Sequence, residues 1–225
     1  MNTKIHIGCG GNLLEGFINV DNSPTALLAR LPSSLTALLN RLSLINPDQL
    51  AFSQTLRQRK KDFLYSNCLH LPLKDESADF CYSSHMLGWC LSRNQLDAFF
   101  KELCRVLKPG GGARLSFFDF DSLLTDYQQH RSTIDLFSRM PLGVREFDFR
   151  DKLKFLFNRN MQNGIPLNIE TISRFLEKYQ FRDIRSLPAG ATMMPPEWVQ
   201  GVDLFERARE SVYIECRKAV PTSLA

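Results

Sequence analysis

Hydrophobic positions fall into short runs along the chain, separated by segments with helical spacing. The runs predict strands at 4–8, 17–21, 62–67, 78–83, 113–118, 181–186 and 211–217. The clearest helix is expected over 93–107, beginning at a capping box formed by Ser92 and Gln95. Its apolar face consists of Leu96, Phe99, Phe100, Leu103 and Leu107. This alternation predicts an α/β fold whose mostly parallel sheet is covered by helices on both faces.

Two segments interrupt the alternation. Residues 24–61 form a long helical excursion between the second and third strands, with leucines at helical spacing and Pro32 dividing it. We expect these leucines to pack on the sheet; the alternative is a partner protein bound through 24–45. Residues 122–166 mix aromatic and basic side chains and are interpreted as an inserted cap over the site.

Length and composition indicate a single domain over 1–225. The 225 residues contain 44% hydrophobic and 23% charged side chains, as in ordinary globular proteins. No apolar run is long enough for a transmembrane helix, and the N-terminus lacks the pattern of a secretory signal. The six cysteines show no paired C-x-x-C spacing, which favours reduced thiols and a cytoplasmic location.

Metal and nucleic-acid sites receive little support from the sequence. Cys81, His85 and Cys90 resemble a partial zinc site but lack a fourth ligand, so no metal is expected. The formal net charge of +4 is too mild for a typical nucleic-acid binder. The densest basic run, at 57–61, is interpreted as a solvated helix end, with an anionic partner as the alternative.

The strongest chemical signal is a glycine turn between the first two strands. Gly8 and Gly10 allow positive φ and close approach of a ligand, and Asp21, which ends the next strand, can accept both hydroxyls of a ribose. Dinucleotide sites need a third glycine and an acid about 20 residues away. Here Leu13 replaces that glycine and Asp21 follows Gly8 by 13 residues, so a ligand without phosphates is favoured over a nucleotide-dependent oxidoreductase.

These residues resemble the first motif of class I S-adenosylmethionine (SAM) dependent methyltransferases. The match is to the methyltransferase type 11-like subgroup that reads G-C-G-x-N followed by N-V-D, here at 8–12 and 19–21. Residues 67–79 and 100–111 resemble two further motifs of the family. The resemblance implies a three-layer Rossmann-like fold with strand order 3-2-1-4-5-7-6 and the last strand antiparallel.

The resemblance also implies which residues contact SAM. The backbone of Gly8, Cys9 and Gly10 would face its amino-acid moiety, and Asp21 would bind the ribose. Asn67 and the N–H of Cys68 would contact adenine, with Leu69 beside the ring. Carbonyl groups around Ser83 and His85 would meet the ammonium group.

The implied reaction is an in-line methyl transfer that leaves S-adenosylhomocysteine. The acceptor is expected to be a small molecule, a glycan or a lipid-linked precursor, and an oxygen acceptor would gain from a general base. His85 and Asp119 are the preferred candidates for that base, ahead of Asp121 and His130.

Two departures from the family pattern affect this prediction. His6 replaces an acid that braces the glycine turn, a role that a neutral imidazole can take over. Gly88 and Trp89 replace a polar pair. The alternative reading is therefore a binding or regulatory protein that retains the fold without catalysis.

Overall fold

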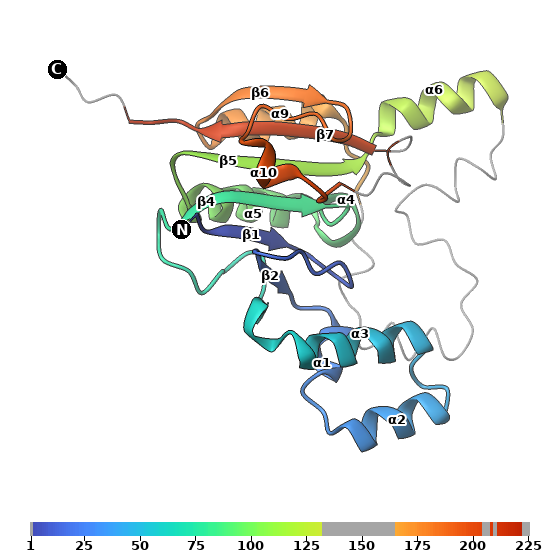
Figure 1. Ribbon diagram of the computed structural model, residues 1–225. Helices are drawn as coiled ribbons and strands as arrows, with labels where there is room; N and C mark the ends of the chain where they lie inside the picture. The colour runs from blue at the N-terminus through green and yellow to red at the C-terminus, as the bar shows by residue number, and fades with distance from the viewer. Residues whose placement is uncertain (1, 132–164, 204–207, 209–210, 222–225) are drawn as a thin grey trace.

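A seven-stranded sheet forms the centre of the computed structural model, which describes residues 2–131, 165–203, 208 and 211–221 (Figure 1). Its order is β3-β2-β1-β4-β5-β7-β6. The strands are β1 (Lys4–Ile7), β2 (Ile18–Asp21), β3 (Phe63–Tyr65), β4 (Ala78–Ser84), β5 (Leu107–Phe118), β6 (Phe181–Leu187) and β7 (Ser211–Lys218). The first five strands are parallel, and β7 runs antiparallel to both β5 and β6. The predicted fold and strand order are confirmed.

One strand is longer than the sequence pattern suggested. β5 begins at Leu107 and not at the predicted residue 113, so the Lys108–Gly112 stretch belongs to the strand. Ala78 already pairs with Leu107, and the register shifts before Phe80 pairs with Gly112. The glycines and proline therefore form an irregular start of the strand rather than a separate loop.

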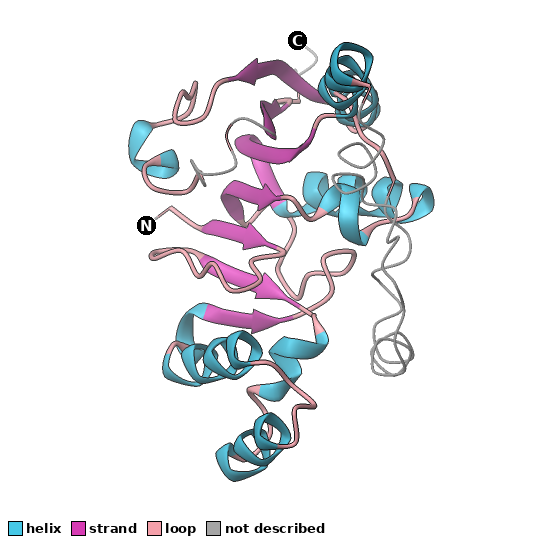
Figure 2. Cartoon of the chain, turned by 90° about the vertical axis from the view of Figure 1, so that its right-hand side faces the viewer, coloured by secondary structure: helices cyan, strands magenta, loops and turns pink. Residues whose placement is uncertain are grey.

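One face of the sheet is covered by α5 (Arg93–Val106), α9 (Ile169–Lys178) and the short α4 (Leu87–Cys90) (Figure 2). The predicted capping box of Ser92 and Gln95 begins α5. The apolar stripe of α5 is fully buried against Ile5, Cys81 and Leu115 of the sheet. Each such Leu or Phe contributes roughly 1.5–3 kcal/mol by leaving water, so this face holds the main core.

The opposite face has a different cover. Residues 188–203, including the short helix α10 (Pro196–Val199), pack there on Phe80 and Tyr82 of β4. The short helix α10 is the helical part of this cover, and the rest of the segment is irregular. Met194 is buried in this cover, and Trp198 packs partly buried against Phe80. Met194 lies against Gly112, at the opposite edge from the ends of the parallel strands.

Charged residues are buried beneath this cover. The guanidinium of Arg114 donates to Asp203 and, at 2.7 Å, to Glu215, and all three side chains are at most 2% exposed. Asp203 also accepts from the backbone N–H of Gly190, and Glu215 accepts from that of Met193. Each charge is paired and hydrogen-bonded, as burial requires. The network ties the 188–203 segment to β5 and β7.

The excursion between β2 and β3 contains α1 (Pro24–Leu28), α2 (Ser33–Arg41), α3 (Pro47–Gln58) and the 3₁₀ turn η1 (Lys60–Asp62). Pro32 separates α1 from α2, as predicted. Arg57 of α3 joins the three helices, because its guanidinium donates to the carbonyls of Leu28, Ala29 and Leu31 and to the hydroxyl of Thr36.

The expected packing of the leucine stripe on the sheet is wrong for α2. This helix packs on α3 and buries only Thr36, while Leu35, Leu38 and Leu42 remain exposed. The spacing indicated an amphipathic helix correctly, but not what covers its apolar face.

Beyond β5, helix α6 (Phe120–His130) occupies the first part of the segment expected to form a cap. Residues 132–164, which make up most of that segment, lie outside the described residues, so the cap remains a prediction. Within the described part of the chain, every helix is too short or too polar to cross a bilayer.

We predict that Arg114→Met lowers the free energy of unfolding by about 3–5 kcal/mol, because it leaves two buried carboxylates without their cation. Urea denaturation measures this loss. Arg174→Met is the matched control: it breaks an exposed i,i+4 pair with Glu170, which contributes at most about 0.5 kcal/mol. Equal losses in the two variants would contradict the role given to the buried network.

Candidate functional site

The ends of five parallel strands meet at one edge of the sheet. Strand β1 lies between β2 and β4, so the strand order reverses beside it, where ligands bind in open α/β sheets. The predicted site residues follow these strand ends: Gly8, Cys9 and Gly10 after β1, Asp21 ending β2, Asn67, Cys68 and Leu69 after β3, Ser83 and His85 at the end of β4, and Asp119 after β5. The topology therefore brings all the predicted positions to one edge.

The glycine turn needs two of its glycines for different reasons. At Gly8, with φ +70°, a Cβ would lie 2.5 Å from Cγ of Met86, so the protein itself fills that space. At Gly10, with φ +49°, a Cβ would meet nothing within 4 Å among the described residues. Gly8 thus serves packing, and Gly10 leaves open space beside the turn.

Asp21 braces this turn through its carboxylate. One oxygen accepts from the backbone N–H of Gly10 at 2.9 Å, and the other accepts from that of Ser23 at 2.6 Å. Each carboxylate oxygen has two lone-pair sites, so each keeps one for a ligand hydroxyl. Asp21 therefore combines an anchoring contact with spare acceptor capacity.

The connection from β1 to β2 contains no helix, as the short spacing suggested. Fully buried Asn19 holds it: its amide donates to the carbonyls of Leu14 and Phe17, and its oxygen accepts from the N–H of Leu14. Sequence reasoning treated Asn19 only as part of a motif. The sequence feature that could have identified its structural role is a single amide side chain between the apolar residues Ile18 and Val20 of a predicted strand.

His6 lies behind the same loop. Its Nδ1 is 3.3 Å from the side-chain oxygen of Asn19. Burial lowers the pKa of His6 from 6.5 to about 4, although its hydrogen bonds to Asn19 and to the backbone of Asn12 favour the charged form. The ring is therefore neutral at pH 7, in agreement with the prediction of a neutral imidazole bracing the turn.

The loop after β3 is shaped by its own side chains. Asn67 is exposed and its side-chain oxygen accepts from the N–H of Leu69 at 3.0 Å, while Cys68 and Leu69 pack partly buried against the main core. Leu71 is fully in the core, and its N–H is held by Glu102 of α5. Asn67 is thus an exposed polar group of this loop, as is His70.

His85 sits in an unusual backbone conformation at the end of β4. Its φ is +53°, its N–H donates to the carbonyl of Ser116, and its Nε2 is 2.9 Å from the hydroxyl of Ser211. The ring also contacts Phe118 edge-on and is only 9% exposed. Nearby Ser83 is buried, and its hydroxyl has no hydrogen-bond partner among the described residues.

The acidic candidates after β5 occupy a helix start rather than a continuing strand. Asp119 is the N-cap of α6 and accepts from Ser122 through one oxygen, while its other oxygen is buried without a partner among the described residues. Asp121, expected to alternate with it along the strand, lies in the first helical turn and accepts from Asn168. His130 is exposed nine residues after Asp121, at the end of the helix.

The replacement at Gly88 has a packing explanation. A Cβ there would lie 3.3 Å from the carbonyl of Ile165, whose N–H donates to the carbonyl of Gly88. The absence of a side chain at Gly88 allows the backbone of Ile165 to approach closely.

The thiols have structural positions. Burial raises the pKa of Cys9 and of Cys81 well above the usual range, so both thiols are neutral. Among the residues that the structure describes, no three His, Cys, Asp or Glu side chains are grouped to hold a metal ion.

We predict that His6 makes stability depend on pH. Its folded-state pKa is below the unfolded value, so the unfolded chain takes up the proton first, and stability falls as pH drops from about 6.5 toward 4. The expected loss from this group is about 2 kcal/mol between pH 7 and pH 5. Urea denaturation at both values should show that loss in the wild type and in His130→Gln, and a loss smaller by about 2 kcal/mol in His6→Gln. Identical pH dependence in all three proteins would disprove the buried neutral imidazole.

Part of the chain is similar to a family of known proteins. Residues 17–115, slightly under half of the chain, match the family described as methyltransferase domain. A malonyl-[acyl-carrier protein] O-methyltransferase of Marinomonas sp. (strain MWYL1) is 47% identical over 49 residues, which are 22% of this chain and 17% of that protein. The match therefore spans about a sixth of that relative.

Solved structures share the fold over nearly the whole chain. A possible histamine N-methyltransferase from Thermotoga maritima aligns with 97% of this chain and 82% of its own, at 18% identity and a TM-score of 0.53. A SAM-dependent methyltransferase from Methanosarcina mazei aligns with 97% of this chain and 93% of its own, at 14% identity and the same TM-score of 0.53. At these identities the likeness concerns the fold.

Proposed function

We propose that the chain is a class I SAM-dependent methyltransferase, which binds SAM at the β1–β2–β4 edge and transfers the methyl group to a small-molecule, glycan or lipid-linked acceptor; the family match over residues 17–115 supports this. The observation that carries this proposal is the carboxylate of Asp21, 2.9 Å from the N–H of Gly10. A carboxylate beside an open backbone turn supports the binding of a ribose there.

The short connection between β1 and β2 supports a ligand without phosphates. Dinucleotide sites place a pyrophosphate at the N-terminus of the helix that follows the first strand. Here that connection contains no helix and is held by Asn19. An adenosine joined to an amino acid needs no such anion site.

Each predicted contact has a role in holding the cofactor. Asp21 would accept the ribose hydroxyls, which makes charge-assisted hydrogen bonds. Asn67 and the N–H of Cys68 would bind adenine, with Leu69 against the ring. The backbone of Gly8, Cys9 and Gly10 and the carbonyls near Ser83 and His85 would enclose the amino-acid end. SAM supplies the electrophilic methyl group, and the protein supplies orientation.

A general base would serve an oxygen acceptor. Asp119 offers an oxygen that is not engaged by the described residues, whereas the imidazole of His85 is held by Ser211 and Phe118. We therefore assign proton acceptance to Asp119 and orientation of the site to His85. The short match to malonyl-[acyl-carrier protein] O-methyltransferases adds a carrier-bound carboxylate to the acceptors worth testing.

We predict that calorimetry detects binding of SAM and S-adenosylhomocysteine and no binding of NAD. Asp21→Asn should weaken SAM binding by about tenfold to a hundredfold, since it removes the charge from the ribose contact. Asp48→Asn, on the exposed start of α3, is the matched control and should bind like the wild type. Heat with NAD alone would reject the proposal.

Transfer of a labelled methyl group from SAM should then be followed with sugars, lipid-linked sugars, small hydroxy and amino compounds and malonyl on acyl-carrier protein. Asp119→Asn should reduce turnover about a hundredfold and leave SAM affinity unchanged if Asp119 is the base. Tight SAM binding with no turnover on any acceptor would favour the alternative, a regulatory protein that retains the ligand. The Gly88 and Trp89 replacement motivates keeping that alternative.

A further inference from the structure

Helix α2 presents an apolar surface that nothing in the described chain covers. Leu35, Leu38 and Leu42 share one side at i, i+3 and i+7 and are 39%, 49% and 58% exposed. Leu27 before the helix and Leu44 after it are also exposed, at 42% and 59%. Five exposed leucines within 18 residues exceed the scattered apolar residues of an ordinary surface.

This leucine surface lies on the outermost element of the molecule. Figure 1 shows α2 below α1 and α3, at the end farthest from β6, and Figure 2 shows the same placement from the side. Its buried side, at Thr36, is held by Arg57 of α3. The leucines therefore project from an anchored ridge, not from a groove.

The charge around the ridge has one sign. Between residues 22 and 47 there are two arginines, Arg30 and Arg41, and no acid. Residues 22–61 carry six basic residues and one acid, a net charge of +5, against +4 for the whole chain, so the rest of the chain is net −1. The excess positive charge is thus concentrated in the excursion.

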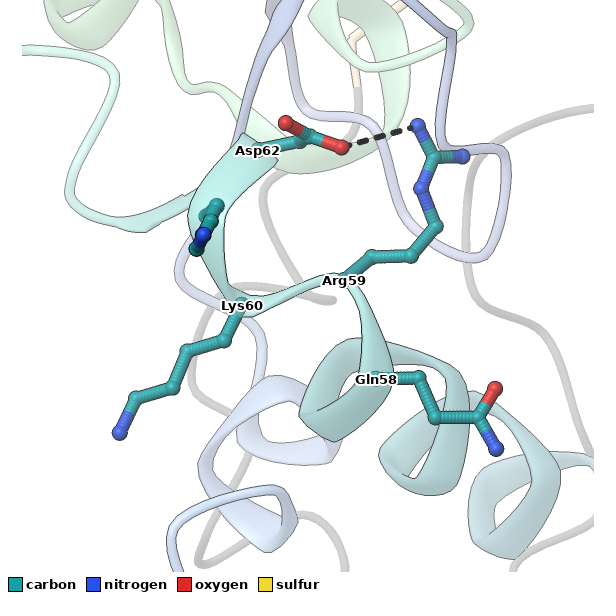
Figure 3. A pocket seen from close by; sticks show the side chains of 5 residues that line it. Gln58, Arg59, Lys60 and Asp62 are labelled. Atoms are coloured by element: carbon teal, nitrogen blue, oxygen red, sulfur yellow. Dashed lines mark hydrogen bonds and ion pairs between the residues drawn. The ribbon is translucent and has the colours of Figure 1, made fainter.

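Two of these cations extend from a hollow at the end of α3. The hollow, about 460 Å³, is lined by residues 58–62. Arg59 is paired with Asp62 and binds the carbonyl of Leu13, whereas Lys60 points away from that pair (Figure 3). Lys60 and Lys61 are both exposed and remain available to an anionic surface.

We infer that the leucine surface of α2 docks on an anionic lipid bilayer. A short amphipathic helix with projecting leucines and flanking basic residues lies in the plane of the headgroups, where apolar burial and electrostatic attraction add. A ridge suits insertion into a lipid surface, which closes around it, better than recognition by a protein groove. This inference does not depend on the methyl acceptor.

The docked surface would be close to the cofactor edge. Helix α1 begins at Pro24, directly after Asp21 and its N-cap Ser23. Leu27 in α1 lies six residues after the carboxylate proposed to bind ribose, and α2 begins at Ser33, twelve residues after it. Docking would hold the open edge of the sheet near the membrane surface.

Sedimentation with lipid vesicles tests the inference on the full chain. The wild type should sediment with vesicles of phosphatidylcholine mixed with phosphatidylglycerol, only weakly with pure phosphatidylcholine, and less in high salt. The double variant Leu38→Ser/Leu42→Ser should lose at least about tenfold in vesicle affinity. Leu124→Ser/Ile169→Ser, which removes two exposed apolar side chains elsewhere, should bind like the wild type.

Several outcomes would overturn the inference. If the wild type does not sediment with vesicles, or if the two double variants bind vesicles equally well, the leucine surface of α2 is not a lipid-binding surface. Equal binding to neutral and anionic vesicles would contradict the inferred electrostatic attraction between the basic residues and the lipid headgroups. If light scattering finds that the wild type is a dimer and that Leu38→Ser/Leu42→Ser is a monomer, the leucine surface binds a second copy of the chain instead. Unchanged thermal unfolding of both variants excludes loss of folding as the cause, and SAM calorimetry keeps this result separate from the proposed function.

Discussion

The buried amide of Asn19 is the contact on which the site geometry depends. Parallel strands normally need a long crossover, usually a helix, to return the chain to the start of the next strand. Here the loop between β1 and β2 makes that return without a helix, and Asn19 satisfies backbone groups that a helix would have satisfied internally. Since β2 then begins in fixed register beside β1, Asp21 reaches the N–H of Gly10.

The two faces of the sheet are stabilised by different means. The α5 and α9 side is an apolar core in which close packing and release of water supply the stability. The other side is closed by an irregular segment, whose backbone groups need partners, and Asp203 and Glu215 provide them while neutralising Arg114. This division places the polar network away from the strand ends and leaves those ends for ligand contacts.

The helical excursion shows that one pattern can have two outcomes. The stripes of α2 and α5 both follow helical periodicity, yet the α5 stripe is fully buried and the α2 stripe is exposed. The difference arises because α5 returns directly onto the sheet, whereas α2 is held by Arg57 against neighbouring helices on its polar side. Periodicity reports that a helix has an apolar face and says nothing about what that face meets.

The sequence by itself determined the positions of the strands, the capping box of Ser92 and Gln95 and the glycine–acid pairing, because these depend on local spacing and backbone freedom, whereas the strand order was implied by the family resemblance. It also grouped the predicted site residues, since parallel strands bring their carboxyl ends to one edge. Only the tertiary structure decided that Asp119 starts a helix, that Met194 is buried, and that the leucines of α2 are exposed. Each of those outcomes depends on which surfaces meet, and contacts between distant segments leave no periodic signal in either segment alone.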